Sequence, residues 1–69
     1  MYPEFTVVRL KIAKTDDRGR SVPAGTEGTI VDINGVAGYC VEVPVLDEQG
    51  RQTDMHLIDI YHEDVESVT

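Results

Sequence analysis

The sequence predicts an all-β domain, a small barrel of about five short strands. Its clearest signal lies in residues 22–31, where a proline and two glycines three positions apart lead directly into a β-branched run. Short apolar segments then recur along the chain, separated by turns rich in Gly, Pro, Asn and Asp. No segment of ordinary length has helical periodicity. A chain of 69 residues has room for a single domain, which we expect to span residues 1–69.

The first strand is expected over residues 5–13, where apolar side chains alternate and the opposite face carries Arg9 and Lys11. Its expected core face is Thr6, Val8, Leu10 and Ile12. Residues 14–21 are polar and contain adjacent acids and a glycine, which predicts an exposed loop. A turn follows at residues 23–25, because proline fixes φ at its start and glycine accepts the positive φ after it.

The second and third strands are expected over residues 26–33 and 39–46. Gly28 inside the second strand indicates a bulge, a sharp bend or the close approach of another backbone. The Asn-Gly pair at 34–35 predicts a hairpin between the two strands. The expected core face of the third strand is Tyr39, Val41, Val43 and Val45. Pro44 cannot donate a ladder hydrogen bond, so its end of the strand is expected at a sheet edge or a bulge.

The fourth strand is expected over residues 51–60, after a turn at 47–50. Its pattern is mixed around Met55, Leu57, Ile58 and Ile60. Residues 61–65 are compatible with a helical turn, and a short closing strand is expected after it. Residues 67–69 are expected to fray.

The net charge of −7 is distributed unevenly: residues 1–20 carry +2 and residues 21–69 carry −9. Two ends of one barrel folded side by side explain this asymmetry, and so does a basic strand that meets an acidic tail within the chain or across a dimer. Non-specific binding to nucleic acid or to anionic membranes needs clustered Lys and Arg, which the acidic total disfavours.

Cys40 is the single cysteine, so the chain forms no intramolecular disulfide. The sequence shows no basic-then-apolar leader and no apolar run long enough to span a bilayer. We therefore expect a soluble cytoplasmic protein that does not bind membranes.

Residues 22–33 resemble the turn and strand of small SH3-like barrels, and in particular the KOW-type segment of translation and transcription proteins. A glycine precedes a β-branched pair in that segment, and here the corresponding run is Gly28-Thr29-Ile30-Val31. With residues 39–43 and 47–51, the order of elements is similar to that of short uncharacterised bacterial proteins, some encoded on mobile or accessory gene elements. The resemblance covers roughly residues 5–65 and implies an SH3-like fold without carrying over any catalytic residue. KOW modules that bind ribosomal RNA are basic, whereas acids follow the turn here.

Three groups of side chains are candidates for a catalytic or metal site. The histidines His56 and His62 lie near Asp54, Asp59 and Asp64, but their spacing matches no common metal motif. The neighbours of Cys40 supply no positive charge to form a thiolate, which favours a small apolar role. Adjacent acids in polar turns are normally both ionised, which disfavours acid–base catalysis. We expect no catalytic residue, no cofactor and no metal, and therefore no enzyme.

Several apolar side chains are out of phase with the expected core faces. They are Phe5 and Val7 in the first strand, Cys40 and Leu46 in the third, and Ile58 and Ile60 in the fourth. A small barrel hides one face of each strand. These additional apolar side chains therefore form either a second small core beneath the loop at 14–21 or an oligomer interface.

The predicted function is that of a non-enzymatic, acidic interaction module that binds a protein partner, including copies of itself as a dimer or tetramer. Binding would use strand pairing at an edge such as the Pro44 end, or apolar contact, with acids steering a basic partner. The predicted partner-binding residues are Tyr2, Phe5, Val7, Tyr39, Pro44, Met55 and Tyr61. An immunity or antitoxin-like role fits the charge and size.

Two alternatives remain. One is a KOW-like nucleic-acid-binding module that uses Arg9, Lys11, Lys14, Arg18 and Arg20. The other is a small metal-binding protein or enzyme that uses His56, His62 and the acids near them.

Overall fold

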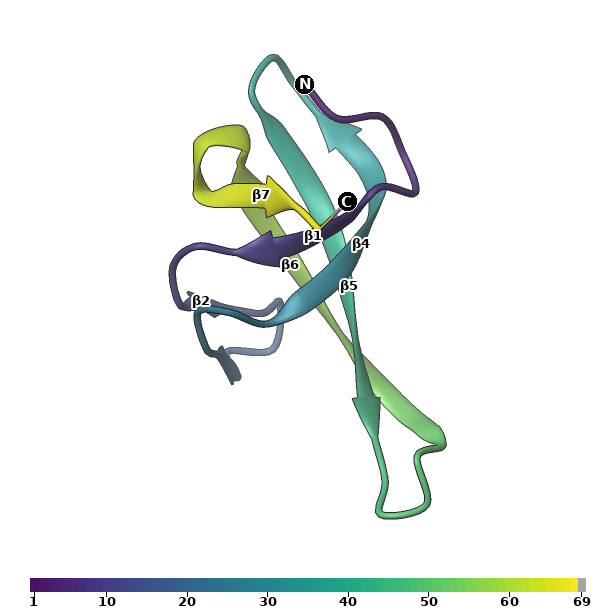
Figure 1. The fold of residues 1–69 in the computed structure, drawn as a ribbon. Helices are drawn as coiled ribbons and strands as arrows, with labels where there is room; N and C mark the ends of the chain where they lie inside the picture. The colour runs from purple at the N-terminus through teal and green to yellow at the C-terminus, as the bar shows by residue number, and fades with distance from the viewer. Residues whose placement is uncertain (69) are drawn as a thin grey trace.

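The structure of the protein is a computed structural model that describes residues 1–68, and it is a small all-β fold (Figure 1). Within that range, five strands form the main antiparallel sheet in the order β6-β5-β4-β1-β7, and β2 pairs with β3. The elements are β1 (Val7–Leu10), β2 (Lys14–Thr15), β3 (Ser21–Val22), β4 (Glu27–Asn34), β5 (Gly38–Leu46), β6 (Gln52–Tyr61), the 3-10 helix η1 (His62–Asp64) and β7 (Val65–Ser67). The all-β prediction is confirmed, including the helical turn and the closing strand after it.

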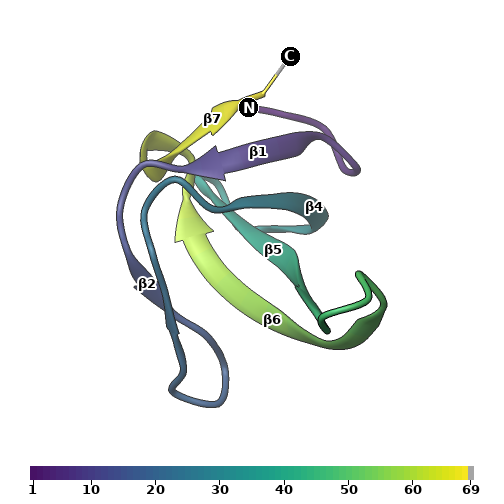
Figure 2. The ribbon, with the colours of Figure 1, turned by 60° about the horizontal axis from the view of Figure 1, so that its bottom comes forward.

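The main sheet curls, and the segment that carries β2 lies beside β6 (Figure 2). Alternate residues of each strand point into the space enclosed by this curl. The buried apolar side chains there are Val8, Leu10, Val22, Ile30, Tyr39, Val41, Val43, Ile58, Ile60 and Val65. Between Ile30 and Asp32 the register of β4 against β5 shifts by one residue, so Val31 is bulged out of the ladder. Among residues 1–68, no helix is long and apolar enough to cross a membrane.

At Gly28, β4 and β5 approach too closely to leave room for a side chain. A Cβ added there would lie 2.7 Å from the Glu42 carbonyl oxygen and from Val41 Cγ1, and 2.8 Å from Val43 Cγ2. Carbon atoms do not approach that closely without displacing a strand. Of the three expected roles of this glycine, the structure therefore shows the close approach of another backbone.

The β5–β6 hairpin extends well beyond the rest of the barrel (Figure 1). Pairing between β4 and β5 ends at Thr29 and Glu42, so the far end of β5 has no strand on that side. Ala37, just before β5, accepts a hydrogen bond from His62 on the β6 side, so the odd-numbered residues of β5 direct their main-chain groups toward β6. The even-numbered residues therefore direct theirs toward the open side. Pro44 thus lies at an open edge, as expected, and it removes the N–H that another strand would need there.

Two expectations about the first strand are wrong. The strand is Val7–Leu10 rather than residues 5–13, and Ile12 is exposed rather than in the core. Phe5 ends the strand on its N-terminal side because its φ of 70° lies in the left-handed region. Its N–H still donates to the Ile30 carbonyl at 2.7 Å, so the segment before β1 stays attached to β4.

The expected phase of β6 is also wrong. Ile58 and Ile60 are buried in the core, whereas Met55 is exposed and Leu57 is half-buried on the outer face. The direct pairing of Ile58 with Val41 and of Ile60 with the core side chain of Tyr39 fixes this phase.

Gly28→Ala is expected to lower the free energy of unfolding by about 1 to 3 kcal/mol, because the added methyl group overpacks the β4–β5 contact. Val43→Ala removes one of the atoms that the methyl group meets. The loss in the double variant, measured by denaturant unfolding, is therefore expected to be smaller than the sum of the two single losses. Additive losses would show that Gly28 does not act through this contact.

Candidate functional site

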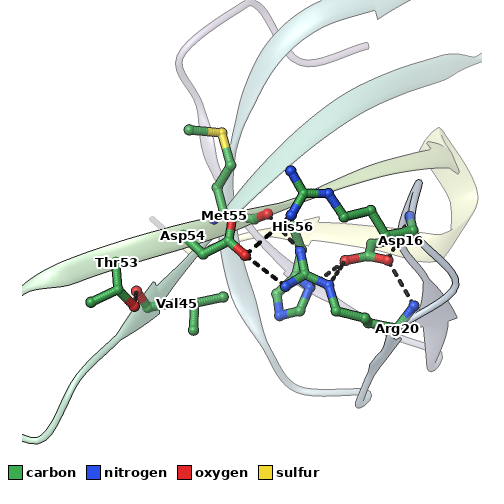
Figure 3. Close-up of polar contacts among 8 residues, drawn as sticks. Asp16, Arg20, Val45, Thr53, Asp54, Met55 and His56 are labelled. Atoms are coloured by element: carbon green, nitrogen blue, oxygen red, sulfur yellow. Dashed lines mark hydrogen bonds and ion pairs between the residues drawn. The ribbon is translucent and has the colours of Figure 1, made fainter.

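A buried carboxylate organises the segment between β2 and β3 (Figure 3). The side chain of Asp16 has no exposed surface. Its Oδ1 accepts the main-chain N–H groups of Arg18 at 2.9 Å and Arg20 at 2.8 Å. Its Oδ2 accepts Arg20 Nε–H at 2.8 Å and the ring N–H of His56 at 2.6 Å. The carboxylate thus joins both ends of this turn to β6, and the expectation that residues 14–21 form a simple exposed loop is wrong at Asp16.

The same network covers part of the free edge of β6. Arg20 donates to Asp54 Oδ2 at 2.8 Å and to the Met55 carbonyl at 3.0 Å. The Asp17 N–H donates to the Leu57 carbonyl at 3.0 Å. These bonds occupy main-chain acceptors that an unprotected edge strand would expose.

The hydrogen bonds decide the charge states in this network. Burial alone would raise the pKa of the Asp16 carboxyl, but the bonds from His56, from the Arg20 and Arg18 amides and from the Arg20 side chain outweigh burial and hold it well below its usual range. The Met55 amide and the Arg20 guanidinium lower the pKa of Asp54, and Asp54 in turn raises that of Arg20. All three groups are therefore charged at neutral pH.

A second polar contact ties the N-terminal segment to the barrel. Tyr39 is completely buried, and its hydroxyl oxygen accepts the main-chain N–H of Tyr2 at 2.8 Å. The same hydroxyl lies 2.5 Å from His62 Nδ1. Which of the two groups donates in this contact depends on the tautomer of His62. The Tyr2 ring also packs against the His62 ring, with centroids 5.0 Å apart.

A groove lies between the β4–β5 turn, the end of β6 and β2. Its volume is about 730 Å³, which is within the range of small-ligand and peptide sites. The groove is lined by Lys14, Asn34, Val36, Ala37, Gly38, Tyr39, Asp59, Ile60 and Tyr61. Tyr61 is 61% exposed and Val36 is 93% exposed. The amide of Asn34 donates to Asp59 Oδ1 at 3.1 Å and so joins the turn to β6.

The structure separates the predicted partner-binding residues. Tyr61 lines the groove with a largely exposed ring, and Tyr2 packs on the barrel half-buried. Exposed positions away from the groove are Phe5, Val7, Pro44 and Met55. Tyr39 also lines the groove, but it is 0% exposed.

Most of the basic side chains are already paired with acids of the same chain. Arg9 contacts Glu27 at 3.1 Å and Glu66 of β7 at 3.7 Å, so the basic strand meets the acidic tail within one molecule. Arg18 pairs with Asp54 at 3.4 Å, as Arg20 does at 2.8 Å. A phosphate backbone would have to displace these carboxylates, which weighs against a nucleic-acid interface.

The residues weighed as metal ligands or nucleophiles have other partners. His56 Nδ1 donates to Asp16, and His62 Nδ1 is hydrogen-bonded to the Tyr39 hydroxyl. Within residues 1–68 no three His, Cys, Asp or Glu side chains are grouped so as to hold a metal ion. Burial raises the pKa of the Cys40 thiol, and the charges of Asp59, Asp32, Asp17 and Glu42 raise it further. The thiol is therefore protonated at neutral pH, which opposes a nucleophilic role.

The sequence reasoning missed the buried carboxylate and the groove. A signal for the carboxylate does exist, because residues 16–20 and 47–51 share the pattern Asp-x-x-Gly-Arg. In both turns the aspartate accepts the amides two and four residues later, and the glycine has a φ near 80°. The pattern predicts the turn but not its burial, which depends on His56 from a distant strand.

Asp16→Asn is expected to lower the melting temperature by on the order of 10 °C, because the new amide group would point donors at the N–H groups of His56 and Arg20. Asp47→Asn is the matched control, since Asp47 makes the same turn bonds in an exposed position. A pair of variants with equal losses would contradict the role assigned to the buried network.

The pH dependence of stability follows from the same carboxyl. Its folded pKa lies below the value of 3.8 expected in the unfolded chain, so the unfolded state binds more protons between the two values. The stability that Asp16 contributes is therefore complete above about pH 4 and is lost as the pH falls through the folded pKa. Thermal melts recorded from neutral to acidic pH are expected to show a shallower acid loss for Asp16→Asn than for the unchanged protein.

Asp59→Asn is expected to increase the alkylation rate of Cys40 by iodoacetamide roughly two- to fivefold at neutral pH. Among the neighbouring charges, that of Asp59 raises the pKa of the thiol most, so its removal lowers this pKa. Asp47→Asn is the control, since Asp47 is not among the charges that act on Cys40. An unchanged rate in Asp59→Asn would mean that burial alone sets the thiol pKa.

Comparison of the chain with protein-family models, with curated proteins and with solved structures gave no match. The assignment of a function therefore rests on the geometry and charge of the groove and on the surfaces around it.

Proposed function

We propose that this protein is a non-enzymatic binding module and that a segment of a partner protein occupies the groove beside Tyr61. The groove is the observation that carries the proposal. It joins an apolar surface from Val36, Ala37 and Tyr61 to the polar groups of Lys14 and Asp59, and binding sites in proteins combine these two kinds of surface.

The exposure of Tyr61 supports this role. A tyrosine supplies a large, rigid contact area and a hydroxyl that remains hydrogen-bonded, so tyrosines are frequent among the side chains that dominate binding energy. The ring is held at the end of β6 by the pairing of Tyr61 with Gly38 and by the His62 N–H, which donates to Ala37 at 2.7 Å. The partner would therefore meet an aromatic surface on a rigid element of the sheet.

A second copy of the chain is one candidate for the partner, as is a foreign protein with a basic segment. The net charge of −7 opposes close approach of identical acidic surfaces and favours a basic partner. Light scattering over a range of concentrations and salt distinguishes the two, because a dimer in the groove would dissociate in Tyr61→Ser.

Selection of random peptides displayed on phage tests the groove directly. The selected peptides are expected to bind Tyr61→Ser at least about tenfold more weakly than the unchanged protein, because the substitution removes a central aromatic contact. Leu46→Ser is the matched control, since Leu46 is 57% exposed but lies on the distant hairpin. The proposal fails if no peptide is enriched, or if both variants weaken binding equally.

A further inference from the structure

In the described chain, no strand pairs with the outer edge of β6 where it borders the groove. The main-chain groups of residues in an antiparallel strand point alternately toward and away from the neighbouring strand. In β6 the carbonyls of Met55 and Leu57 point away from β5, since the segment carrying Arg20 and Asp17 binds them there. The N–H of His62 points toward β5, since it donates to Ala37. The main-chain groups of Asp59 and Tyr61 therefore point away from β5.

The covering segment does not extend to these two residues. Asp17 donates to the Leu57 carbonyl, but β2, which precedes Asp17, forms no strand pair with β6, and Lys14 of β2 lines the groove together with Asp59 and Tyr61. Within residues 1–68, β5 is the only strand paired with β6, and β2 belongs to a separate two-stranded sheet, so the outward N–H and C=O groups of Asp59 and Tyr61 take part in no strand pair. Edge groups of this kind are the template that an additional strand pairs with.

The charge beside this edge is negative. Asp32, Cys40 and Asp59 are direct cross-strand neighbours, so their side chains share the outer face of the sheet. Asp59 is exposed at the last of the three strands, and the charges of Asp59 and Asp32 both act on the Cys40 thiol. A strand added next to β6 would place a side chain directly beside the Asp59 carboxylate.

We propose that the partner segment adds to β6 as an extra antiparallel strand along Asp59–Tyr61, with a lysine or arginine beside Asp59 and an apolar side chain beside Tyr61. These two partner residues lie two positions apart, because alternate residues of a strand share one face. Both need a free N–H to pair with β6, so neither is proline. This inference rests on the proposed function and specifies the mode of recognition and the chemistry of the partner segment.

The test uses the peptides selected on the unchanged protein. They are expected to share a basic and an apolar residue two positions apart. N-methylation of either of these residues is expected to weaken binding about tenfold, because each methyl group removes a main-chain hydrogen bond to β6. N-methylation of the residue between them is the control, since its N–H points away from β6, and binding is expected to change less than about twofold.

Two measurements on the protein complete the test. Hydrogen exchange at the amides of Asp59 and Tyr61 is expected to slow when the peptide is added. Asp59→Asn is expected to weaken binding several-fold, whereas Asp47→Asn, which removes an acid from the distant hairpin turn, leaves it unchanged.

The outcomes separate this inference from the proposed function. Peptides that need Tyr61 but tolerate N-methylation at every position would overturn strand addition and leave the binding module intact. Enrichment of acidic or proline-rich peptides would overturn it as well. Failure to enrich any peptide would remove both proposals.

Discussion

The hydrogen bonds of the Asp16 carboxylate are the constraint on which the open side of the barrel depends. Residues 11–26 contribute only Val22 to the apolar core, so burial of apolar surface offsets little of the entropy lost in ordering them. The hydrogen bonds of Asp16 to His56 and Arg20 stabilise the ordered conformation of this segment instead. They hold the covering segment against β6 and thereby place Lys14 on one side of the groove.

The two Asp-x-x-Gly-Arg turns show how the same local sequence takes on different roles. At residues 47–51 the turn closes an exposed hairpin, and its arginine lies 3.8 Å from its aspartate. At residues 16–20 the contact shortens to 2.8 Å and the aspartate is fully buried. Local chemistry specifies the turn in both places, whereas burial depends on the approach of His56, which lies 40 residues away. For this reason the sequence predicted a turn at 47–50 and a loop at 14–21 but not the buried carboxylate.

The strands show the same division between local and distant information. Strict alternation in 39–46 predicted the phase of β5 correctly, because Tyr39, Val41 and Val43 are buried together, although Val45, expected on the same core face, is only half-buried. In β6 the apolar residues from Met55 to Ile60 occupy both phases, so the local pattern could not choose between them. The register against β5 makes that choice. The groove was equally hidden from sequence, since β2, the β4–β5 turn and the end of β6 meet only in the folded chain.

The treatment of strand edges indicates which surface is available to a partner. Pro44 removes a donor from the open side of β5, and Arg20 and Asp17 occupy the carbonyls of Met55 and Leu57. Both devices oppose unwanted pairing with other chains. The stretch from Asp59 to Tyr61 has no strand paired on its outer side in the described chain, although it borders a groove and carries an exposed aromatic ring. The Asp59 carboxylate opposes pairing with another acidic chain and favours pairing with a basic one. At this stretch, charge therefore selects the partner, whereas elsewhere the strand edges are protected by proline or by bound side chains and loops.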